Sequence, residues 1–166
     1  MIEERVWAYF QNMRQLPQHI LFYRDGVSES QFGMVSLEEL PLIRRGCNNA
    51  GARANAGANW SPRITLLVVG KRHHTRFYPI NPDRPGQPGA NLSSGLVVDR
   101  VVTSPWRADF YLQSHDSALG SAKSAHYIVI VNESNYFMDE LQELVSPTLT
   151  SPFPFVILFY FNIKMC

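Results

Sequence analysis

The chain has 166 residues, of which 45% are hydrophobic and 17% are charged, and its formal net charge is +1. These values indicate one globular domain or a piece of a larger one, in which a nucleic-acid binder would need its basic groups on one face. Cys47 and Cys166 lie about 120 residues apart without metal-ligand spacing, which excludes a disulfide framework and a zinc site. The sequence shows no secretory signal and no apolar stretch of the roughly 20 residues that a membrane helix needs. We therefore expect a cytoplasmic or nuclear protein with no membrane contact.

The first elements are expected to be a helix and a strand. Val6, Tyr9, Phe10 and Met13 recur every three or four residues, which predicts an amphipathic helix over residues 2–15. Pro17 ends this helix and leads into a strand that contains Phe22. Apolar residues between positions 32 and 43 predict a second helical region, which Pro41 disturbs.

Residues 19–32, HILFYRDGVSESQF, link that strand to the second helical region. Four apolar residues suit a buried strand, Asp25-Gly26 is a strong turn dipeptide, and Ser28 or Ser30 suits a helix cap. An aspartate at the carboxyl end of a buried strand lies where α/β proteins usually place their chemistry. The alternative is a turn aspartate that bonds its own backbone.

Residues 46–61, GCNNAGARANAGANWS, have no apolar period, so we predict a surface loop there. A phosphate-binding loop is a weaker alternative because the Gly-Lys-Ser/Thr ending is missing. Residues 64–69 are rich in Ile, Leu, Val and Thr and predict a second buried strand.

A basic segment, KRHHTR, follows this strand at residues 71–76. Three fixed positive charges at a strand end, with aromatic residues next to them, suit contacts with phosphates. An ordinary solvated basic turn is the alternative. A metal site is not indicated, because neighbouring strand residues such as His73 and His74 point to opposite faces and no carboxylate or cysteine accompanies them.

The rest of the chain predicts a loop and three more strands. Residues 79–95 are rich in proline and glycine, and strands are expected at 97–102, 108–113 and 125–131. Together with the earlier elements they predict an α/β protein with a mixed sheet and covering helices. His115 and Lys123 lie between the last two strands, and the residues alone favour a hydrogen-bonded loop histidine at position 115.

Four long stretches follow one another across residues 1–144: FYRDGVSESQF, ITLLVVGKRHHTRFYP, VVDRVVTSPWRADFYLQSH and SAHYIVIVNESNYFMDELQEL. Together, and in this order, they resemble motifs of the PIWI domain of Argonaute proteins. The sequences of these motifs are most similar to those of the eukaryotic Argonautes. The resemblance implies part of an RNase H-like fold.

The resemblance also implies roles for single residues. Asp25 matches a catalytic, Mg²⁺-binding aspartate of the family. The residues that match family contacts to the guide-strand backbone are Lys71, Arg72, Arg76, His115 and Lys123. Lys123 stands where the family usually has arginine. Lysine keeps the positive charge but cannot form the bidentate hydrogen bonds that arginine makes to a phosphate. His126 matches a family histidine outside the catalytic tetrad, whose own histidine belongs to a YYAHLAAFRAR-like segment that this chain lacks. Of the expected Asp-Glu-Asp-His set, only Asp25 is present.

The resemblance predicts a partial PIWI domain over residues 1–144 and a non-family tail over residues 145–166. Val-Ser at the junction is what a common intron opening encodes, and pyrimidine-rich codons follow, so we interpret the tail as translated intron or a gene-model artefact. The alternatives are a divergent terminal strand at residues 153–161 and a membrane contact, although this run is too short to span a bilayer.

Three functional hypotheses follow from the resemblance. The first is a PIWI piece that binds guide and target RNA in gene silencing without cleaving it, because one carboxylate cannot hold two ions about 4 Å apart. The second is an RNA-guided endoribonuclease in a full-length parent whose intact site binds Mg²⁺. The third is a non-functional truncated product. Other proteins of a silencing complex are further expected partners.

Overall fold

The computed structural model describes residues 1–55, 60–78, 92–115, 123–146 and 155–160, the last as backbone. The chain forms two compact units. Unit 1 comprises Met1–Val68, Val129–Tyr136 and Pro152–Cys166, and unit 2 comprises Val69–Ile128 and Phe137–Ser151. Within the described ranges, no helix has the length and apolarity to cross a membrane.

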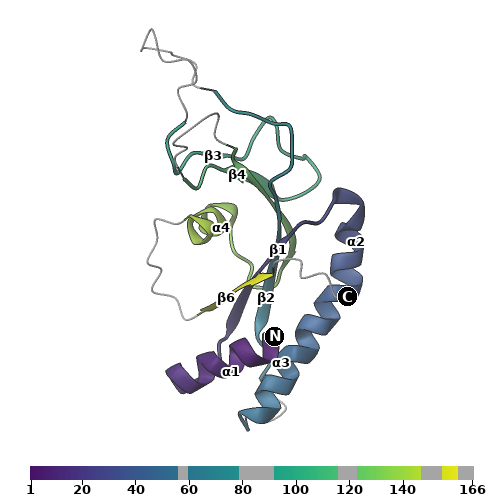
Figure 1. Ribbon diagram of the computed structural model, residues 1–166, viewed down its shortest axis with the longest axis vertical. Coiled ribbons are helices and arrows are strands. Elements are labelled where there is room, and N and C mark those ends of the chain that lie inside the picture. Colours follow the sequence, from purple (N-terminus) through teal and green to yellow (C-terminus); the bar gives the residue numbers. More distant parts are fainter. Residues whose placement is uncertain (56–59, 79–91, 116–122, 147–154, 161–166) are drawn as a thin grey trace. The chain divides into compact units, whose positions relative to one another are not determined.

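Unit 1 is built on strands β1 (His19–Asp25), β2 (Arg63–Gly70) and β6 (Phe155–Tyr160) (Figure 1). Strand β5 (Ala125–Asn132) contributes to both units, and the strand order in unit 1 is β5-β2-β1-β6. β1 pairs with β6 in parallel, with His19 opposite Phe155. The centres of β1 and β2 are buried, as expected for continuous apolar strands, so both strand predictions are confirmed.

Helices α1 (Ile2–Met13) and α3 (Leu40–Arg53) pack against each other in unit 1. Between β1 and α3 the chain forms a 3₁₀ turn η1 (Glu29–Gln31), a short α2 (Phe32–Met34) and a π-helical turn η2 (Val35–Glu39). Both predicted helical regions are confirmed, and Ser28 is the N-cap residue of η1. Pro41 lies in the first turn of α3, directly after the π-helical turn η2.

The loop predicted over residues 46–61 is wrong for its first half, because α3 continues to Arg53. A Cβ atom added to Gly46 would lie 3.1 Å from Cβ of Ile2, and one added to Gly51 would lie 2.7 Å from Cε3 of Trp60. The small residues therefore allow close packing rather than a flexible loop. Residues 56–59 lie outside the described part of the chain.

Unit 2 contains the antiparallel strands β3 (Val97–Val98), β4 (Asp109–Leu112) and the start of β5, in that order. Leu112 lies opposite Ala125. Helix α4 (Met138–Val145) also belongs to this unit. Parallel pairing of β1 with β6 and antiparallel pairing here confirm the predicted mixed α/β sheet with helices.

Two of the three later strands match their predictions, and one is shorter. β4 and β5 confirm the strands predicted at 108–113 and 125–131. The strand predicted over 97–102 ends at Val98, since Val101 has a φ of 69° and is fully exposed. Of the loop predicted over 79–95, residues 79–91 lie outside the described residues.

Strand β6 lies inside the tail that begins at residue 145, as the terminal-strand interpretation expects. Its presence does not test whether the tail is translated intron, so that interpretation stays a prediction.

Candidate nucleic-acid interface

Asp25 is the last residue of β1 in unit 1, and its side chain is partly exposed. The next residue, Gly26, has a φ of 77°, so the chain turns sharply through a conformation that favours glycine. Arg24 is buried, and its Nη1 donates to the backbone oxygen of Asp25 at 2.6 Å. The same guanidinium contacts both carboxylate oxygens of Glu39. The aspartate backbone is therefore held in place from η2.

The described residues do not fit a two-metal centre around Asp25. They contain no group of three or more His, Cys, Asp or Glu residues placed to hold a metal ion. Two-metal hydrolysis needs several oxygen or imidazole ligands around the ion pair. Among the described residues, Asp25 is therefore not part of such a ligand set.

The basic segment at residues 71–76 begins immediately after β2 and belongs to unit 2. Lys71, Arg72 and His74 are exposed, whereas His73 is half-buried. The His73 ring donates from Nε2 to the backbone oxygen of Ser124 at 2.7 Å and meets the Tyr111 ring edge-on. The two neighbouring histidines thus differ in exposure, although both lie beyond the end of β2.

Arg76 differs from the other two cations of this segment. Its Nη1 donates to the backbone oxygens of His73 at 2.9 Å and Thr75 at 2.6 Å. The guanidinium is half-buried and closes the turn on itself. The Arg76 side chain therefore stabilises the backbone of the basic segment.

His115 and Lys123 are both exposed and lie at one end of the β4–β5 pair. His115 follows β4 and Lys123 precedes β5, and these strands are antiparallel with Leu112 opposite Ala125. A Cβ atom added to Gly70 would lie 3.8 Å from Cβ of His126, so the end of β2 is beside the start of β5. Unit 2 therefore gathers four of the five predicted RNA-binding residues, with exposed side chains, at neighbouring strand ends: Lys71, Arg72, His115 and Lys123.

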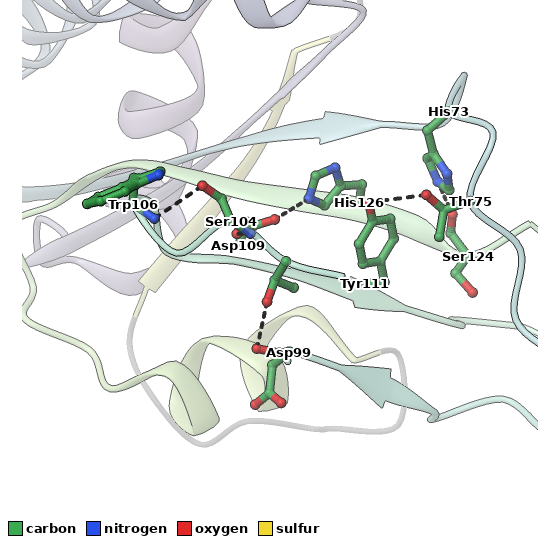
Figure 2. A network of polar contacts seen from close by, with 10 residues as sticks. His73, Thr75, Asp99, Ser104, Trp106, Asp109, Tyr111, Ser124 and His126 are labelled. Carbon is green, nitrogen blue, oxygen red and sulfur yellow. Dashed lines mark hydrogen bonds and ion pairs between the residues drawn. The ribbon is translucent and has the colours of Figure 1, made fainter. Parts of the chain in front are cut away.

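Sequence reasoning missed a buried group of side chains in the same unit (Figure 2). Asp109 is buried, accepts from the backbone N–H of Ser104 at 2.9 Å and pairs with Nε2 of His126 at 2.6 Å. The His126 ring stacks on Tyr111 with centroids 4.1 Å apart. Tyr111 and His126 are cross-strand partners, so strand register was the signal that could have predicted their contact.

Comparison with protein families and curated proteins relates the chain to one group. The Piwi domain model matches residues 1–150. Protein argonaute 5 of Arabidopsis thaliana is 41% identical over 149 residues, which is 88% of this chain and 14% of the relative. Protein argonaute 1D of Oryza sativa subsp. japonica is 41% identical over 152 residues, with the same coverage of 88% and 14%.

Solved structures agree with the sequence comparisons. The C-terminal lobe of a budding yeast Argonaute matches with a TM-score of 0.77 and 32% identity, over 86% of this chain and 30% of that one. Kluyveromyces polysporus Argonaute with a guide RNA gives the same score and identity, over 86% and 18%. These matches confirm the expected RNase H-like architecture, while the chain spans only about 14% of the length of the first curated relatives. The chain therefore belongs to the Piwi domain family of the eukaryotic Argonautes.

Proposed function

We propose that this chain binds guide and target RNA through the nucleic-acid backbone in small-RNA-guided gene silencing. The observation that carries the proposal is the exposure of Lys71, Arg72, His115 and Lys123 at neighbouring strand ends of unit 2. Support comes from the similar Kluyveromyces polysporus Argonaute, whose structure contains a guide RNA. Arg76 contributes mainly by holding the turn, since its Nη1 already donates to two backbone oxygens.

Lysine and arginine side chains that meet phosphates bind without reading base sequence and release counterions when they bind. Replacing Lys71 and Arg72 by alanine should weaken binding to all RNA sequences alike. At about 0.7 to 0.9 per contact, the slope of log affinity against log salt should flatten by roughly 1.4 to 1.8.

The experiment is a salt titration of single-stranded RNA and RNA-duplex binding by the wild-type chain and the Lys71→Ala, Arg72→Ala variant. Circular dichroism first establishes that both are folded. A matched control replaces Arg5, an exposed residue on α1 in unit 1, by alanine and should leave the slope unchanged. An unchanged slope in the double variant would mean that the basic segment is only a solvated turn.

Our proposal for cleavage is that this chain does not cut RNA. Asp25 is proposed as one Mg²⁺ ligand of a parent site, and the described residues supply no second and third ligand beside it. Incubation with a guide, a labelled complementary RNA and Mg²⁺ or Mn²⁺ tests this. Cleavage that disappears in Asp25→Ala would overturn it and favour the RNA-guided endoribonuclease.

We place RNA binding in the cytoplasm or nucleus, with other silencing-complex proteins as partners. A non-functional product is the remaining alternative, and it predicts no RNA binding by the folded chain under any salt condition.

A further inference from the structure

The three segments that carry Lys71, Arg72, His115 and Lys123 are joined by three hydrogen bonds, one of them buried and two partly buried. His73, from the basic segment, donates to the backbone oxygen of Ser124, the neighbour of Lys123. The Ser124 hydroxyl donates to Oε1 of Gln113 at 2.8 Å. The Gln113 amide donates from Nε2 to the backbone oxygen of His115 at 2.6 Å. We call His73, Gln113 and Ser124 the polar latch.

We propose that the polar latch positions the Lys71–Arg72, His115 and Lys123 segments so that they contact one RNA backbone together. None of the three latch residues is proposed to touch RNA. The inference rests on the proposed RNA binding and deepens it, because it names the residues that set the spacing of the contacts. Gln113 and Ser124 are therefore positioning residues.

Because Gln113 and Ser124 are buried, their side chains are held to these hydrogen-bond partners. Gln113 is 1% exposed and Ser124 is 6% exposed, so an unmade bond there would leave a polar group away from water. The backbone N–H of Gln113 also donates to Leu96 and its carbonyl accepts from Gly95, which fixes the start of the glutamine side chain. The amide can therefore reach both Ser124 and His115 from one fixed position.

The His73 end of the latch is similarly constrained. Its Nε2 must carry the proton in order to donate to a carbonyl oxygen, and its ring meets Tyr111 edge-on with centroids 5.2 Å apart. Within the described residues, its Nδ1 is buried without a hydrogen-bond partner. The half-buried imidazole, which is held by this hydrogen bond and also meets the His126 ring edge-on, keeps Lys71 and Arg72, two and one residues earlier, close to the start of β5.

The test uses substitutions that remove no charge. Gln113→Met deletes both side-chain hydrogen bonds at similar volume, and Ser124→Ala deletes one. The double variant replaces both partners by apolar groups, which protects the fold if a single change leaves a buried polar atom unsatisfied. The matched control is Thr65→Val in unit 1, which removes a buried hydroxyl that contacts Asn132.

Single-stranded RNA binding is measured against salt for each folded variant, beside wild type and the Lys71→Ala, Arg72→Ala protein. We expect Gln113→Met and the double variant to flatten the salt slope by about 0.7, the value of one contact, although no charged group has changed. Thr65→Val should keep the wild-type slope. A substitution that only weakens the fold would lower the melting temperature and leave this slope as it is.

Two results would overturn the inference, and they are distinguishable. If the Lys71→Ala, Arg72→Ala protein loses slope while Gln113→Met and the double latch variant keep it, the latch is a structural feature only. If the Lys71→Ala, Arg72→Ala protein itself keeps the slope, the proposed RNA binding fails and the latch proposal falls with it.

Discussion

Arg24 forms a two-point ion pair with Glu39, with Nε 2.8 Å from Oε2 and Nη2 2.9 Å from Oε1. The Arg24 side chain is 8% exposed and that of Glu39 is 23% exposed. This pair joins the end of β1 to η2, and the third guanidinium nitrogen holds the backbone of Asp25. The geometry at the predicted catalytic aspartate thus depends on a carboxylate 14 residues further along the chain.

The first prediction is that Glu39→Ala destabilises the chain by about 3 kcal/mol, because it removes the carboxylate that neutralises the buried Arg24 guanidinium. Urea unfolding measures the free energy. The comparison is Glu38→Ala, an exposed neighbour, which should change the stability by less than about 0.5 kcal/mol. Equal effects at both positions would show that the ion pair contributes nothing specific.

The second prediction concerns the glycines that a loop interpretation treated as flexible. Gly51→Ala should cost about 1 to 3 kcal/mol, because its Cβ would lie 2.7 Å from Cε3 of Trp60. Gly33→Ala is the matched control, since nothing lies within 4 Å of its Cβ position, and it should be neutral or stabilise by about 0.5 kcal/mol. Thermal melts of both variants decide between packing and flexibility.

The helices and most strands could be predicted because apolar periodicity and proline positions are local signals, as for α1 and β2. Two errors had non-local causes. Glycine and alanine at residues 46–53 suggest a loop until the contact with Trp60 is known, and the valines at 101 and 102 suggest a strand although the chain turns at Val101. Among the site residues, the family resemblance predicted the exposed cations, but no local pattern predicted that Gln113 and Ser124 would meet.

The third prediction uses Cys47, whose thiol is buried in α3. Burial raises its pKa from an ordinary 9.0 to about 11, and the charge of Arg44 opposes this only partly. Since the folded pKa is the higher one, the contribution to stability is complete below pH 9.0 and is lost as the pH rises towards about 11.

Unfolding free energies at about pH 8 and about pH 10.5 should therefore differ by roughly 1 to 2 kcal/mol from this thiol. In the Cys47→Ala protein, the difference in unfolding free energy between the two pH values should be smaller by this amount. Burial also raises the pKa of Tyr127, so a smaller decline of the same sign should remain in the variant. An identical pH dependence in both proteins would contradict the assignment to Cys47.

The fourth prediction concerns the tail from residue 145. If it is translated intron, spliced cDNA from the source should omit the bases that encode Val145 onward and continue with a reading frame containing a YYAH-like segment. If spliced cDNA still encodes the residues of β6, the terminal-strand interpretation is supported instead, and the pairing of β6 with β1 would be part of the native sheet.

The last prediction separates two aspartates that look equivalent in the sequence. Asp109 is 5% exposed and holds both the backbone N–H of Ser104 and the His126 ring, whereas the Asp99 side chain is 36% exposed and contacts Gln142 at 3.2 Å. Asp109→Ala should cost about 2 to 4 kcal/mol, because a buried donor and a stacked histidine lose their acceptor. Asp99→Ala should cost less than about 1 kcal/mol, as its partners can turn to water. Urea unfolding of both variants gives the two free energies. Similar values would mean that the Asp109–His126 pair adds no more to stability than an exposed contact.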